Sequence, residues 1–299
     1  MHRKNDTVAP IFLKDFALAS HRIGQFSVEP LSVTTTSAQE QYLIELINRA
    51  RLDPLAEAAR QGVSLNDNLA SGTITATQKS PLAPNGVLAT AAEGHSSWML
   101  AADVFSHVGQ NNSSPDDRIV AAGYDLTGSW SWGENLAWYG TTGRLGLKAA
   151  IDTHHTGLYL SASHRENIFG ESFQEIGVAQ VVGDFTSGGT DFKTSMLTQS
   201  YGSTGSSVFI TGVAYRDRSG DGFYSIGEGR GNVALSAAGA QDATGKAGGY
   251  ALEIAAGGMV DVTIGSGRNP SMVRVDTSAG NVKLDVVGRE IQSSSDLDL

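Results

Sequence analysis

The 299-residue sequence contains no cysteine. Disulfide bonds, cysteine-ligated zinc and thiol nucleophiles are therefore excluded, because each of them requires a thiol group. Charged residues are also scarce, at 17% of the chain, and 31 acidic against 21 basic residues give a net charge of −10. Proteins that bind nucleic acid normally cluster Lys and Arg on one surface. The basic residues are scattered in this sequence, so we expect no nucleic-acid partner.

Long apolar runs are missing as well. A transmembrane helix needs about 20 consecutive apolar residues, and no stretch of this sequence approaches that length, so we expect no transmembrane segment. The N-terminus begins with basic residues, but the apolar stretch that follows is interrupted by Pro10 and stopped by Lys14, so we expect no cleavable secretory signal. The sequence does contain 40% hydrophobic residues and 36 glycines, a composition typical of a globular protein rich in turns and strands.

The chain divides at residues 202–207, which are all Gly, Ser or Thr and predict a flexible linker. Before this point, helical patterns followed by strand patterns predict an α+β domain at 37–201, preceded by a leader or linker at 1–36. After it, short strands separated by Gly, Asp and Asn turns predict a small all-β sandwich at 208–290. An exposed tail is expected at 291–299.

Local signals place the individual elements. Ser37 and Glu40 form a capping box at a helix start, and Asp53-Pro54 separates this helix from a shorter second one. Further helices are predicted at about 85–102, 114–123 and 142–159, and strands at 175–182, 192–201, 208–215, 233–237, 250–254, 259–264, 272–275 and 282–287.

Histidines gather in the middle of the chain. Five of the seven histidines fall between His95 and His164, and Glu134 lies among them in a Gly-Glu-Asn segment. Two imidazoles and a carboxylate in one cleft can hold a divalent ion or transfer protons near neutral pH. Equally, such residues can be hydrogen-bonded core groups, and His95 on the apolar side of its helix is expected to be one. Trp130 and Trp132 beside Glu134 are expected to pack a core beneath a long loop.

Five segments resemble the CAP (SCP) family of cysteine-rich secretory, antigen 5 and pathogenesis-related proteins, and its bacterial branch in particular. These segments are 46–54, 105–107, 133–137, 163–168 and 173–178. The resemblance implies an α-β-α sandwich, an extracellular location, and a central cleft whose two histidines and two acidic residues can take a divalent metal such as zinc.

Three residues match this cleft directly: His107, Glu134 and His164. Where the family has its second acidic residue, this sequence has Ser161, with His155 upstream as a candidate substitute. Three functions stay open. The cleft binds an extracellular lipid or glycan, or zinc on the two matched histidines activates water for hydrolysis with Glu134 as general base, or the cleft is vestigial in a structural adhesin. No nucleophile elbow supports hydrolysis independently.

A second motif predicts calcium. Asp217, Ser219, Asp221, the carbonyl of Phe223 and Glu228 occupy positions 1, 3, 5, 7 and 12 of a calcium-loop pattern, with a glycine at position 6. The alternative is an unliganded Asp/Gly turn. Together with its flanking strands, the loop resembles B-type repeats of bacterial serine-aspartate adhesins and related prealbumin-like sandwiches. That resemblance implies structural calcium and again an extracellular or cell-surface location.

Overall fold

The computed structural model describes residues 22–23, 36–255, 257–266 and 270–294, so the predicted leader or linker lies almost wholly outside the described residues. The helices are α1 (Ala38–Leu52), α2 (Pro54–Gln61), α3 (Gly86–Ala101), α4 (Pro115–Ala121), α5 (Leu147–Leu160) and α6 (Ala162–Phe169). The longer strands are β3 (Gly128–Thr141), β4 (Glu175–Ser187), β5 (Thr190–Thr204), β6 (Val208–Tyr215), β9 (Gly249–Ile254), β10 (Met259–Ile264), β11 (Ser271–Asp276) and β12 (Val282–Val287). Shorter strands are β1 (Arg22–Ile23), β2 (Ala83–Pro84), β7 (Ala234–Ala237), β8 (Ala240–Ala243) and β13 (Glu290–Ser293).

Helix α1 begins as its capping signal predicts. Ser37 Oγ accepts from the Glu40 amide at 3.2 Å, and the Glu40 carboxylate accepts from the Ser37 amide at 2.8 Å. Helix α2 follows with Asp53 as N-cap and Pro54 at its first position, where a missing N–H costs nothing. It ends at Gly62, whose φ of 71° is the left-handed conformation that glycine adopts most readily. The predicted helix pair is therefore confirmed.

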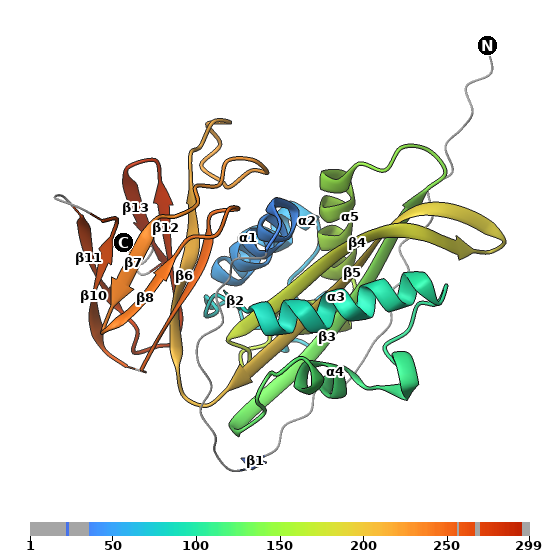
Figure 1. Cartoon of the computed structure of the whole chain (residues 1–299), viewed down its shortest axis with the longest axis horizontal. Helices are drawn as coiled ribbons and strands as arrows, with labels where there is room; N and C mark the ends of the chain where they lie inside the picture. Colours follow the sequence, from blue (N-terminus) through green and yellow to red (C-terminus); the bar gives the residue numbers. More distant parts are fainter. Residues whose placement is uncertain (1–21, 24–35, 256, 267–269, 295–299) are drawn as a thin grey trace.

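The central sheet has the strand order β1-β3-β5-β4-β2, and its long strands β3, β5 and β4 are antiparallel neighbours (Figure 1). Its two faces pack into different apolar clusters. Leu136 and Trp138 of β3 pack with Met99 of α3, whereas Ala137 packs in the cluster that contains residues of α1, α5 and α6. Helices thus contact both faces, and the mixed α and β fold expected from the sequence is confirmed.

The segment around Glu134 is a strand, not the long loop predicted from the sequence. β3 is buried on both faces along most of its length, so beyond Trp132 its sequence does not alternate between apolar and polar residues. Trp132 and Trp138 are buried in the sheet-to-helix packing, each against a separate part of α3. The aromatic residues therefore belong to the core, as expected, although the backbone that carries them is extended.

The C-terminal part contains two four-stranded sheets, β11-β10-β7-β8 and β13-β12-β6-β9. Residues from both sheets contribute to one apolar cluster, such as Val262 from the first and Leu284 from the second. Two predicted boundaries are wrong. Strand β5 continues to Thr204 and leaves a connection of 205–207, and strand β13 occupies the start of the predicted tail, with Ser294 buried behind it. Residues 295–299 lie outside the described part.

The two parts of the chain share a core. Val213, Tyr215 and Tyr224 of the C-terminal part belong to the same apolar cluster as Tyr42 and Leu43 of α1. Polar contacts add to this interface, because the Asn281 amide donates to the carbonyls of Pro81 at 2.9 Å and of Gln174 at 2.7 Å. Within the described residues, no helix is long and apolar enough to cross a membrane.

Candidate functional site

The predicted cleft is centred on a buried pair. His107 lies in the turn after α3, Glu134 projects from β3, and the His107 Nδ1 and Glu134 Oε1 atoms are 2.7 Å apart. The two residues are 4% and 3% exposed. The structure therefore brings together the two residues whose proximity the family resemblance implies, but it places them in the protein interior.

Arg118 of α4 completes this group. Its Nη2 donates to Glu134 Oε2 at 2.6 Å, and its Nη1 donates to the carbonyls of His107 and Ser113, each at 3.0 Å. Burial alone would raise the pKa of Glu134, but the hydrogen bond from His107 and the charge of Arg118 outweigh burial and lower it. Glu134 is therefore a carboxylate whose two oxygens are both engaged.

Gly109 makes room for Arg118. A Cβ atom at this position would lie 2.8 Å from Ser113 Oγ, 2.9 Å from Arg118 Nη1 and 3.2 Å from His95 Nδ1. His95 itself packs as expected for a core histidine: its ring stacks on Trp98, and its Nε2 lies 2.9 Å from a backbone carbonyl in the turn before His107. Burial lowers the pKa of His95 to about 4, so it is neutral at physiological pH.

His164 lies at the start of α6, which packs on the face of β3 opposite to the Glu134 side chain. Ser161 stands where the family has its second acidic residue. Its Oγ is 2.7 Å from His164 Nδ1, so it is a hydrogen-bond partner of this histidine. The pleat of β3 points Asn135 away from the side that Glu134 occupies, and the Asn135 amide donates to the His164 carbonyl at 3.2 Å. The Asn167 side-chain amide donates to the backbone carbonyl of Glu134 at 3.3 Å, which fixes α6 against β3.

His155, the candidate substitute for the missing acidic residue, has a different partner. Its Nε2 lies 3.0 Å from Glu57 Oε1, and Arg49 and Arg60 also bind this carboxylate. Burial would raise the pKa of Glu57, but the hydrogen bonds from His155 and Arg49 outweigh it and lower the pKa well below its ordinary value. Sequence reasoning missed this cluster, because nothing in the local pattern connects helices α2 and α5.

Glu134 is not available as a zinc ligand in this arrangement. One of its oxygens is bound by His107 and the other by Arg118. Across the described ranges, no group of three or more His, Asp or Glu side chains is placed to hold a metal ion. A metal at Glu134 would have to displace a guanidinium that already neutralises the carboxylate.

The predicted calcium loop is held by its own backbone amides. Asp217 accepts from the amides of Gly220 at 2.6 Å and Gly222 at 2.9 Å. Glu228, the predicted bidentate ligand, is 6% exposed and uses both oxygens: Oε1 accepts from Arg218 and Ser219 amides, and Oε2 from the Ser225 amide. The backbone amide of Phe223 donates to Asp221 Oδ1 at 2.9 Å. This donor set does not present Glu228 to a cation, so the structure lends the calcium prediction from the sequence no support.

Comparisons with known proteins find one matching family model and similar solved structures. A model of the cysteine-rich secretory protein family (CAP) matches residues 44–200. An extracellular protein containing an SCP domain, from Bacillus anthracis str. Ames, is 22% identical over 41% of this chain and 34% of that chain, with a TM-score of 0.29. An outer surface protein from Borrelia burgdorferi is 15% identical over 42% of this chain and 78% of that chain, with a TM-score of 0.29.

No curated protein matches the chain significantly. The matched region contains α2 to α6, β3, β4, most of α1 and β5, and the residues His107, Glu134 and His164. Since the family model matches more than half of the 299 residues, the chain belongs to the CAP family.

Proposed function

We propose that this chain is an extracellular CAP-domain protein that works by binding a ligand, and that its His107–Arg118–Glu134 group supports the fold instead of performing hydrolysis. One observation carries the proposal: both oxygens of Glu134 are paired inside the protein, one with His107 and the other with Arg118.

A hydrolytic role for Glu134 is disfavoured by its environment. A general base must reach a water or substrate with a free oxygen, and its pKa should lie near the working pH. Glu134 is 3% exposed, and its pKa is lowered by its hydrogen bond to His107 and by Arg118, so it is a weak base without an open side. The buried pair also offers no surface to a lipid or glycan, and that choice of ligand stays a prediction from the sequence.

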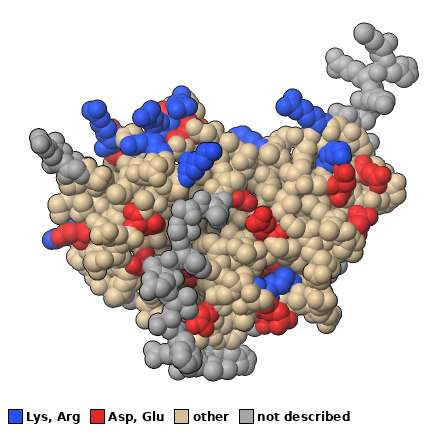
Figure 2. All heavy atoms as spheres, in the orientation of Figure 1, with Lys and Arg blue, Asp and Glu red and all other residues tan. Residues whose placement is uncertain are grey.

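The extracellular assignment is supported by membership of the cysteine-rich secretory protein family. The surface is compatible with such a role. On the face drawn in Figure 2, described basic side chains gather along the upper edge, and acidic side chains lie in small groups over a largely uncharged surface. A structural adhesin is the second candidate, and it rests on the calcium-loop pattern of the sequence from Asp217 to Glu228.

The proposal is tested by esterase assay of the purified full chain with p-nitrophenyl acetate, with added zinc and with chelator. We expect no saturable turnover above buffer under either condition. The variant Glu134→Gln serves as the matched control, with circular dichroism confirming that it is folded. Saturable turnover that is lost on chelation and in folded Glu134→Gln would overturn the proposal in favour of the hydrolase.

A further inference from the structure

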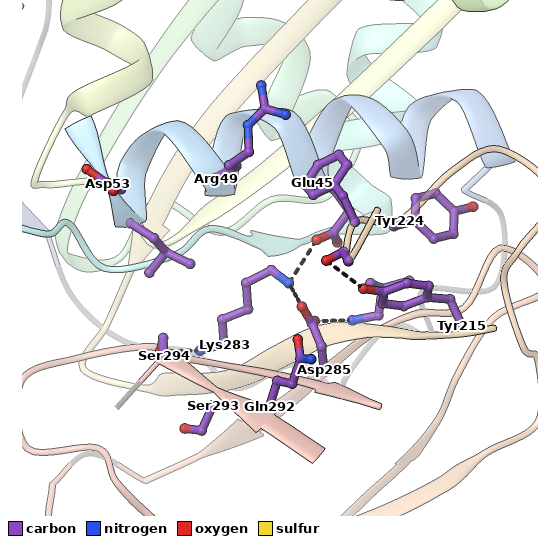
Figure 3. Close-up of a pocket in the computed structure, with 14 residues that line it drawn as sticks. Glu45, Arg49, Asp53, Tyr215, Tyr224, Lys283, Asp285, Gln292, Ser293 and Ser294 are labelled. Carbon is purple, nitrogen blue, oxygen red and sulfur yellow. Dashed lines mark hydrogen bonds and ion pairs between the residues drawn. The ribbon is translucent and has the colours of Figure 1, made fainter. Parts of the chain in front are cut away.

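A pocket of about 240 Å³ lies where the CAP part meets the C-terminal sheets (Figure 3). One wall is the C-terminal half of α1, and the opposite walls are β6, β12, β13 and the segment 222–224. It is not the predicted cleft, because none of the cleft candidates lines it. Pockets for drug-sized ligands span about 300–1,000 Å³, so this one suits a molecule of about one ring or a short chain.

The sides of the pocket are largely apolar and aromatic. Tyr215, Phe223 and Tyr224 contribute rings, and Leu52 and Val213 contribute aliphatic groups. Tyr224 is 1% exposed, and its hydroxyl has no partner among the described atoms. Aromatic faces carry negative electrostatic potential and attract organic cations.

The charges in the pocket are unbalanced. Lys283 lies between Glu45 and Asp285, at 2.8 Å from Glu45 Oε2 and in direct contact with Asp285 (Figure 3). Arg49 also lines the pocket, but its guanidinium points away from Lys283 and forms a two-bond pair with Glu57 outside the pocket. Lys283 is therefore left to balance two pocket carboxylates.

Asp53 at the end of α1 adds a third carboxylate to the lining, so the acidic excess is larger still. Asp285 is the more open of the two acids beside Lys283, with 18% of its side chain exposed against 3% for Glu45. Its Oδ1 accepts one hydrogen bond, from the Val213 amide, and a carboxylate oxygen can accept a second. Of the two acids beside Lys283, Asp285 is therefore the one that a cation entering the pocket would reach first.

We propose that this pocket binds a small organic ammonium ion with an apolar body of about one ring. The ammonium group pairs with Asp285 and offsets the acidic excess. The body packs against the rings of Tyr215 and Tyr224, because the Arg49 guanidinium already lies over the Phe223 ring at 4.9 Å from its centroid. An anion of the same shape is disfavoured, because it would add charge of the same sign to a partly buried acidic site. The inference rests on the proposed binding function, for which it names a site and a ligand class.

Isothermal titration calorimetry of the full chain tests the inference, with phenethylamine as probe and phenylacetate as its anionic counterpart. We expect saturable binding of phenethylamine and none of phenylacetate. Asp285→Asn should weaken binding about tenfold, as loss of one partly buried ion pair does. The control Glu253→Gln removes an acid from the separate hollow beside β9, so it should leave the affinity unchanged.

Asp53→Asn provides a second variant in case Asp285→Asn fails to fold. Asparagine keeps the N-cap of α2 while removing the charge, so the fold survives and the affinity should fall a few-fold. No binding of phenethylamine, equal binding of phenylacetate, or the same affinity in wild type and both Asp variants would overturn the inference. The esterase assay separates the failure of this inference from the failure of the proposed function. If the inference fails and no turnover is seen, the proposed binding function still stands, whereas Glu134-dependent turnover would overturn that function.

Discussion

Replacing Lys283 with methionine removes the ammonium that joins the two parts of the chain. Its side chain is 9% exposed, and it contacts Glu45, at 3% exposed, and Asp285, at 18%. Breaking a buried ion pair by deleting one partner typically costs about 3–5 kcal/mol, because the remaining charge is left in a poorly solvated site. We expect a loss of this size at pH 7.5, measured as the free energy of unfolding in urea followed by circular dichroism.

The loss should shrink on acidification. Burial raises the pKa of Glu45, and Lys283 opposes this rise, so removing Lys283 raises the pKa further. A carboxyl group with a raised folded-state pKa favours folding fully below its unfolded-state pKa, and this benefit is lost as pH rises through the folded-state pKa. The difference between Lys283→Met and wild type should therefore be smaller at pH 5 than at pH 7.5.

Two further variants make this test specific. Lys193→Met removes the lysine of an exposed pair with Asp184, in which the side chains are 63% and 70% exposed, and should cost less than about 1 kcal/mol. The double variant Lys283→Met/Glu45→Gln should recover part of the loss, because it removes the stranded charge. If Lys283→Met costs no more than Lys193→Met, the buried network does not hold the two parts together.

Three other predictions follow from the site and its surroundings. Gly109→Ala should lower the free energy of unfolding by about 1–3 kcal/mol, because the added methyl group crowds Arg118. Gly94→Ala, on the open side of α3, should raise it by about 0.5–1 kcal/mol. Equal melting temperatures of the two variants would contradict this. Acidification from pH 6.5 to 4 should lower the free energy of unfolding of the wild type in urea. Burial lowers the pKa of His95 to about 4, so the stability that its neutral form provides is lost as pH falls through that window. An unchanged dependence of the unfolding free energy on pH in His95→Gln would exclude this histidine as the source. Millimolar calcium should leave the melting temperature unchanged, because backbone amides already occupy the oxygens of Glu228. A rise in melting temperature that disappears in Glu228→Gln would instead show that calcium binds the folded loop through Glu228.

Elements governed by local signals could be predicted from the sequence. Helices α1 and α2 follow from a capping box, a helical apolar stripe and an Asp-Pro boundary, all within about 25 residues. Strand β3 could not be predicted, because it is buried on both faces and the alternation of polar and aromatic residues stops at Trp132. Helix α6 was missed because its polar sequence, Ser163-His164-Arg165-Glu166, has no apolar stripe, although Arg165 is fully buried.

The site divides in the same way. The family resemblance indicated His107 and Glu134, and the structure joins them across 27 residues of sequence. Arg118 lies inside the helix predicted at 114–123, and its contact with Glu134 depends on how α4 packs against β3. Likewise, Glu57 and His155 are 98 residues apart, and only the packing of α2 near α5 brings them together. Partners of a buried charge depend on tertiary packing, which local patterns do not encode.

Zinc binding by the purified full chain tests the central claim most directly. The chain is dialysed against excess zinc, freed of unbound metal, and analysed for zinc per chain in the wild type, His107→Ala and His164→Ala. If Arg118 and His107 satisfy Glu134 internally, the wild type should retain well below one zinc per chain, and the two variants should retain the same amount. One zinc per wild-type chain, lost in both variants, would show that the cluster is a metal centre and would contradict the account.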